Sequence, residues 1–136
     1  LPGAAEAVAA VAAAGLPMAL VTDGFYGRDY VERALEKLGI KEQFRAVVIS
    51  CEVGTGKPQP ALFLAACREM GVNPGEALFI GDKEDRDIAG AARVGMKTLL
   101  VGKAPRKTRP DFFLPDLRQL AEKLPTFLKG GPGAPG

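Results

Sequence analysis

The chain has 136 residues, of which 47% are hydrophobic and 25% charged, and its formal net charge is +2. This length and balance indicate one globular domain that buries a core without disulfide staples. The small net charge favours neither a nucleic-acid partner nor a membrane partner, and the lack of histidine excludes His-based triads and His-ligated zinc sites.

The alanine-rich first twenty residues are similar to a signal peptide in composition alone. They carry Glu6, lack a basic start and are interrupted by Gly15 and Pro17, so a helix followed by a strand is the better interpretation. The two cysteines, Cys51 and Cys67, are not spaced as a CxxC pair. They are typical of reduced thiols in a cytoplasmic protein.

Helical and strand patterns alternate along the chain. In chain order we expect a helix at 4–14, a strand at 18–21, a helix at 29–38, a strand at 46–49, a helix at 58–70, a strand at 77–80, a helix at 85–94 and a strand at 98–101. The strands are continuous apolar runs, which indicates cover on both faces. The alternation therefore predicts an α/β fold, a three-layer α/β/α Rossmann-like core with a mostly parallel sheet.

A weaker strand at 111–114 and a last helix at 117–124 complete the expected domain, which covers residues 1–126. Residues 127–136 are rich in glycine and proline, so we expect a flexible tail there.

Polar residues follow three of the expected strands. Thr22-Asp23-Gly24 follows the first strand, Lys57 ends the loop after the second, and Asp82 follows the third. Ligands of open α/β sheets bind at the carboxyl ends of the strands, so these groups are expected at one edge. A hydroxyl, an ammonium and a carboxylate suit phosphoryl transfer, which depends on positioning and charge neutralisation.

The acidic run after the third strand is a candidate metal site. Asp82 is expected to hold Mg²⁺, which prefers oxygen ligands, and Asp87 to hold metal-bound water or to brace Lys57. Glu84 and Asp85 are weaker candidates for the same role, because acids in a first helical turn often serve only the helix dipole. Thr22 and Lys57 likewise have simple structural interpretations, as a turn residue and a surface lysine.

Two other phosphate-site patterns fit poorly. Residues 54–57 are similar to a phosphate-binding loop, but Pro58 stands where that loop needs a Ser or Thr for the metal. A receiver domain would place its acidic residues before the Thr and Lys, whereas here the acidic cluster follows them.

The ordered motifs resemble those of the haloacid dehalogenase-like hydrolase superfamily over about residues 1–124. Residues 20–24 are similar to its second motif, 56–60 to its third and 79–91 to its fourth. The resemblance implies catalytic roles for Thr22 and Lys57 and Mg²⁺ ligation by Asp82 and Asp87. It also implies that substrate is bound by Thr22, Asp23, Gly24 and Lys57, with Asp23 standing where the family often has Asn.

The family's first motif, an Asp-x-Asp sequence that closes the central strand, does not precede Thr22, and no cap domain is recognised. In the family that strand lies between those ending at Thr22 and Asp82. These two strands are therefore expected either to pair directly or to accept another strand, from a homo-oligomer partner or a complementing N-terminal segment. The chain alone is expected to be inactive or very weak.

The resemblance favours a Mg²⁺-dependent phosphatase acting on a small phosphorylated substrate, here without its nucleophile segment. The alternative is a non-catalytic phosphate- or metal-binding or assembly module on the same scaffold. Neither interpretation involves nucleic acid or a membrane.

Overall fold

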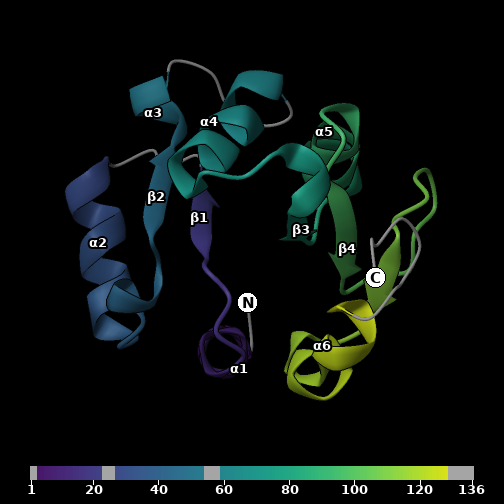
Figure 1. The fold of residues 1–136 in the computed structure, drawn as a ribbon, viewed down its shortest axis with the longest axis horizontal. Helices are drawn as coiled ribbons and strands as arrows, with labels where there is room; N and C mark the ends of the chain where they lie inside the picture. The colour runs from purple at the N-terminus through teal and green to yellow at the C-terminus, as the bar shows by residue number, and fades with distance from the viewer. Residues whose placement is uncertain (1–2, 23–26, 54–58, 129–136) are drawn as a thin grey trace.

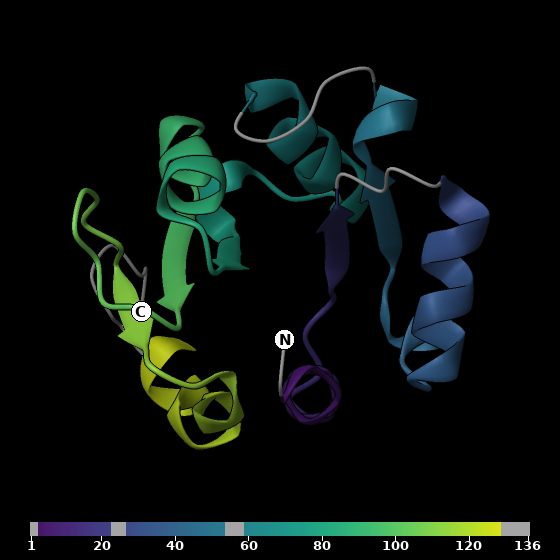
Figure 2. The same ribbon diagram turned by 180° about the vertical axis from the view of Figure 1, so that it is seen from behind.

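The structure is a computed structural model that describes residues 3–22, 27–53 and 59–128 (Figures 1 and 2). Its helices are α1 (Ala4–Ala13), α2 (Arg28–Lys37), α3 (Ser50–Val53), α4 (Pro60–Met70), α5 (Ala89–Arg93) and α6 (Leu120–Leu128). Its strands are β1 (Ala19–Thr22), β2 (Ala46–Ile49), β3 (Leu78–Gly81), β4 (Lys97–Val101) and β5 (Phe112–Leu114). The predicted α/β fold with parallel strands is confirmed.

Local sequence accounts for the ends of several elements. α4 begins at Pro60, where a missing N–H costs nothing, and ends at Met70, before Gly71, whose φ of 71° suits a residue without a Cβ. α6 continues to Leu128, two residues into the expected tail, and the rest of that tail lies outside the described residues.

Among the described helices, none is long and apolar enough to cross a membrane.

The strands form two separate parallel sheets. β1 pairs with β2, with Leu20 opposite Val47, and β3, β4 and β5 pair in that order, with Ile80 opposite Leu99. β1 and β3 do not pair with each other, so the direct pairing that the sequence left open is not observed. Both views draw β1 and β3 apart, with β2 beside β1 and with β4 beside β3.

Helices on two faces hold the sheets together. On one face α1 packs against both, because Ala5 and Val8 join the cluster that contains Leu20 of β1, and Val11 joins the cluster that contains Ile80 of β3. α1 also lies against α6 there (Figure 1).

On the other face α4 contacts β1 and β2 and carries Phe63, which packs edge-on against Phe79 of β3 at a ring-centroid distance of 5.0 Å. Val21 of β1 packs against the same cluster as these two rings. β1 and β3 therefore both lie between α1 and α4, although no hydrogen-bonded ladder joins them.

The strands differ in burial. Thr98–Val101 of β4 is fully buried, as expected for a strand covered on both faces and paired on both edges. All four residues of β1 are only half-buried, although their apolar run is as continuous as that of β4. Within the described residues no strand pairs with the second edge of β1 or with the second edge of β3. The incomplete burial of β1 fits this open edge.

Candidate functional site

The end of β3 forms a compact corner around the carboxylate of Asp87. Asp87 is 2% exposed, and its Oδ2 accepts hydrogen bonds from the backbone N–H groups of Asp82 and Lys83, both at 3.1 Å. Hydrogen bonds to an ionised carboxylate are stronger than those between neutral groups. Asp87 therefore fixes the backbone of the two residues that follow β3.

Gly81 is required for this close approach. A Cβ added at this position would lie 2.4 Å from the Cβ of Asp87 and 2.5 Å from its Cγ and Oδ2. These separations are far below the 3.5–4.0 Å at which carbon atoms attract, so no larger residue fits while Asp87 keeps its position. The glycine and the aspartate, six residues apart, form one structural unit.

A π-helical turn brings Asp87 back toward β3. The sequence predicts an ordinary helix at 85–94, whereas the structure has a π-helical segment, η3 (Glu84–Ile88), followed by α5. The wide turn is visible in the bond from the N–H of Ile88 to the carbonyl of Lys83, at 3.2 Å. Single π-turns occur frequently at functional sites.

The side chain of Asp82 is half-buried at this corner, directly after the buried strand. Mg²⁺ is usually held by one or two carboxylates together with water and substrate phosphate, so Asp82 fits as one of its ligands. Across residues 3–22, 27–53 and 59–128 no group of three potential His, Cys, Asp or Glu ligands occurs. Within those ranges, therefore, Asp82 and Asp87 do not by themselves form a complete set of metal ligands.

The other predicted site residues lie elsewhere or outside the described residues. Thr22 is half-buried at the end of β1, opposite Ile49 of β2, in a different sheet from β3, the strand that Asp82 follows. Asp23, Gly24 and Lys57 lie outside the described residues. The structure thus brings Asp82 and Asp87 together, and the meeting of Thr22 and Lys57 with them remains a prediction.

Glu84 binds a loop at residues 106–108, far from it in the sequence, and the sequence pattern did not reveal this contact. Its Oε1 accepts the N–H of Arg106 at 2.8 Å, and its Oε2 accepts the N–H groups of Lys107 and Thr108 at 3.0 and 2.8 Å and the Thr108 hydroxyl at 2.6 Å. The Thr108 hydroxyl and the Arg106 and Lys107 N–H groups lower the pKa of Glu84 to about 2. Because these donors occupy the carboxylate, Glu84 is a poor candidate for a metal ligand.

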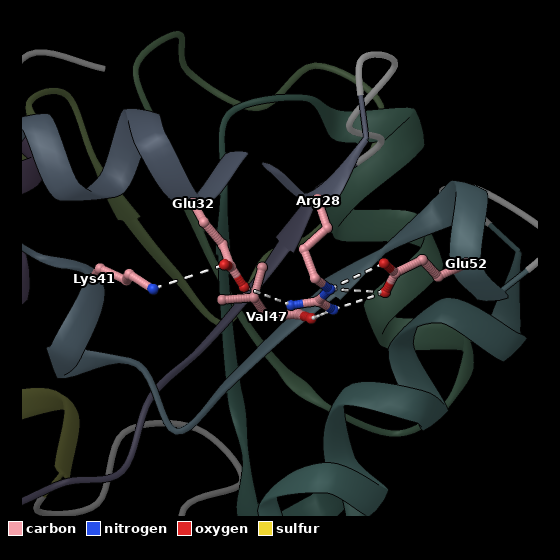
Figure 3. A network of polar contacts seen from close by, with 5 residues as sticks. All are labelled: Arg28, Glu32, Lys41, Val47 and Glu52. Carbon is pink, nitrogen blue, oxygen red and sulfur yellow. Dashed lines mark hydrogen bonds and ion pairs between the residues drawn. The ribbon is translucent and has the colours of Figure 1, made fainter. Parts of the chain in front are cut away.

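A second polar network lies beside β2, in the sheet of β1 and β2 (Figure 3). Arg28, the first residue of α2, binds both carboxylate oxygens of Glu52, contacts Glu32 at 3.2 Å and donates to the carbonyl of Val47 in β2 at 2.7 Å. Lys41 pairs with Glu32 at 3.6 Å. The guanidinium covers part of the edge of β2, so we assign the network to edge protection.

Known proteins give an independent comparison. Residues 1–95 match the family model of the haloacid dehalogenase-like hydrolases. The chain is 37% identical over 123 residues to a glyceraldehyde 3-phosphate phosphatase of Methanopyrus kandleri, a match that covers 85% of this chain and 52% of that protein. It is 39% identical over 116 residues to a phosphoserine phosphatase of Thermus thermophilus, which covers 81% and 46% respectively.

The fold is also similar to solved structures. A HAD phosphatase from Thermococcus onnurineus superposes with a TM-score of 0.78 at 27% sequence identity, covering 91% of this chain and 57% of that one. The chain thus spans about half the length of the curated relatives and of the solved protein that it matches.

Proposed function

Because the chain belongs to the haloacid dehalogenase-like hydrolases, we propose that it forms the phosphate- and Mg²⁺-binding part of a phosphatase core that acts on a small phosphorylated metabolite. The observation that carries the proposal is the corner in which Asp87 and Gly81 fix the backbone of Asp82 at the end of β3. The phosphatase activities named for the relatives support the class of reaction.

In the proposed site, each motif residue has a distinct role. Thr22 donates hydrogen bonds from its hydroxyl and its N–H to oxygen atoms of the phosphoryl group, and Asp23 and Gly24 border the substrate. Lys57 neutralises negative charge on the phosphoryl group and on the attacking carboxylate. A transferring phosphoryl group needs such neutralisation and alignment more than covalent assistance.

Asp82 is the proposed direct Mg²⁺ ligand. Asp87, whose Oδ2 already accepts two backbone N–H groups, is proposed to hold the segment in place and to contact the metal through water. When bound, Mg²⁺ would supply positive charge to the phosphate oxygens. With few ligands among the described residues, the affinity of this chain for the metal should be weak.

The attacking group is proposed to come from a strand inserted between β1 and β3. Both strands lie between α1 and α4, and β1 is half-buried along its whole length. An inserted parallel strand would pair with the backbone groups that face this space, which are costly to leave unpaired in a core. An aspartate at the end of that strand would attack phosphorus, release the alcohol and form a phosphoaspartate that water hydrolyses.

We propose that this strand comes from a segment preceding residue 1 in the same polypeptide, because the relatives are about twice as long as the matched region. Light scattering and amide exchange on this chain test the choice. The expected result is the mass of one 14.3 kDa chain, with amide exchange faster in β1 than in β4. A stable dimer with protected β1 amides would instead identify a second copy as the source of the strand.

Thermal denaturation tests the metal and phosphate site. Mg²⁺ together with inorganic phosphate should raise the melting temperature of the wild-type chain, because a ligand at ten times its Kd stabilises by about 1.4 kcal/mol. Asp82→Asn should abolish the rise. Asp85→Asn removes the same charge from an exposed position three residues away and should retain the rise.

Equal responses of all three proteins would refute the site. Retained Mg²⁺ and phosphate binding, without hydrolysis in a protein that also carries the inserted strand, would favour the non-catalytic binding module.

A further inference from the structure

The loop between β4 and β5, residues 102–111, concentrates positive charge beside the Asp82 corner. Its seven central residues contain Lys103, Arg106, Lys107 and Arg109 and no acid. The net charge of the whole chain is +2, so the remainder of the chain carries −2. All four basic residues are exposed, and none of their side chains makes a salt bridge to any residue that the structure describes.

The loop is held at both ends and at its tip. Gly102 begins it with a φ of 109° and donates its N–H to the carbonyl of Leu114 at 2.9 Å. At its other end, Asp111 accepts the N–H of Thr98 at 2.8 Å. At the tip, Glu84 accepts the three consecutive N–H groups of residues 106–108. Holding the backbone in this way lowers the entropy cost of ligand binding.

The hydrogen bonds from residues 106–108 to Glu84, called the Glu84 clamp below, also place the loop next to Asp82, the candidate metal ligand. Glu84 lies two residues after Asp82, and the parallel register of β3 and β4, with Gly81 opposite Leu100, puts both following segments at the same end of the sheet. Backbone and hydroxyl donors occupy the carboxylate of Glu84, and it forms no salt bridge with any of the four basic side chains.

From this arrangement we propose that the loop binds a second anionic group of the substrate, a carboxylate or a second phosphate, while the reacting phosphoryl group lies at Asp82. This inference rests on the proposed function and narrows its substrate class to phosphorylated metabolites with two anionic groups. The four cations, rather than a shaped pocket, provide the recognition, so the preference for doubly anionic compounds falls as salt is added.

Matched compounds test the proposal on the full chain with excess Mg²⁺ by calorimetry. 3-Phosphoglycerate and glycerol 3-phosphate differ by a carboxylate in place of a hydroxymethyl group, and fructose 1,6-bisphosphate and fructose 6-phosphate differ by a second phosphate. We expect the doubly anionic member of at least one pair to bind about tenfold more tightly. The pair that shows the preference identifies the anion as carboxylate or phosphate.

The variant Arg106→Gln/Lys107→Gln should reduce this ratio to about threefold or less, since each exposed charge contributes little alone. Lys103→Gln/Arg109→Gln repeats the test without changing the residues whose backbone Glu84 holds. The control, Arg33→Gln/Lys37→Gln, removes the same charge from exposed positions of α2 and should leave the ratio unchanged.

The outcomes separate this inference from the proposed function. If the singly phosphorylated compounds bind and Asp82→Asn weakens them, but the ratio is near one or survives both loop variants, the loop proposal alone is wrong. If neither compound of either pair binds, or binding is independent of Asp82, the proposed function and the loop proposal both fail.

Discussion

Replacement of Gly81 by alanine should destabilise the protein strongly, although a Gly→Ala change in a strand ordinarily stabilises it by about 0.4–1 kcal/mol. The new methyl group would lie 2.4–2.5 Å from three atoms of the buried Asp87 side chain. Asp87 would have to move, and its bonds to the N–H groups of Asp82 and Lys83 would be lost. Each such bond to a charged acceptor contributes about 1.5–3 kcal/mol.

Two lost bonds and a modest overpacking cost, less the backbone gain, leave a destabilisation of at least about 3 kcal/mol. For a chain of this size, that lowers the melting temperature by about 10 °C. Urea and thermal denaturation followed by circular dichroism measure both quantities.

Gly75→Ala is the matched control, because a Cβ there meets no atom within 4 Å. A Gly81→Ala protein as stable as Gly75→Ala, or more stable than wild type, would refute the packing of Gly81 against Asp87.

Three further outcomes are expected. The carboxyl group of Glu84 should titrate near pH 2. Because this folded pKa lies below the ordinary value of 4.5, the contribution of Glu84 to stability is present above pH 4.5 and is lost as the pH falls toward 2. An NMR titration midpoint above 4 would contradict the hydrogen bonds of the Glu84 clamp. Arg28→Gln should change the urea midpoint little, since exposed ion pairs are weak, but should increase self-association in light scattering relative to Arg33→Gln, because it uncovers the edge of β2. Phe63→Ala should cost about 3–5 kcal/mol in urea denaturation, because the ring is fully buried against Phe79, and a cost below 1 kcal/mol would contradict the packing of α4 on β3.

The sequence predicted the strands well because their apolar runs are continuous and end at polar residues or glycine. Each observed strand begins and ends within one residue of its expected position, from Ala19–Thr22 to Phe112–Leu114. The π-turn at Glu84–Ile88 was not predictable from periodicity, since the extra residue per turn serves the contact between Asp87 and the backbone after β3.

Contacts in the candidate site were predictable only where they are local in the sequence. Asp82 and Asp87 lie only five residues apart in one short motif, and the N–H of Asp82 donates to the carboxylate of Asp87. The partners of Glu84 are 22–24 residues away, and nothing in the composition of the loop indicates which acid would hold it. The split between β1 and β3 depends on pairing between distant strands, for which the sequence left more than one arrangement open.

Paramagnetic relaxation by Mn²⁺, which prefers the same oxygen ligands as Mg²⁺, tests the central claim most directly because it detects weak binding and reports position. In the wild-type chain with inorganic phosphate, Mn²⁺ should broaden the amide signals of Gly81, Asp82 and Lys83 first. The broadening should persist in Asp85→Asn and disappear in Asp82→Asn. Broadening centred on another part of the chain, or unchanged in Asp82→Asn, would contradict the assignment of this corner as the metal site.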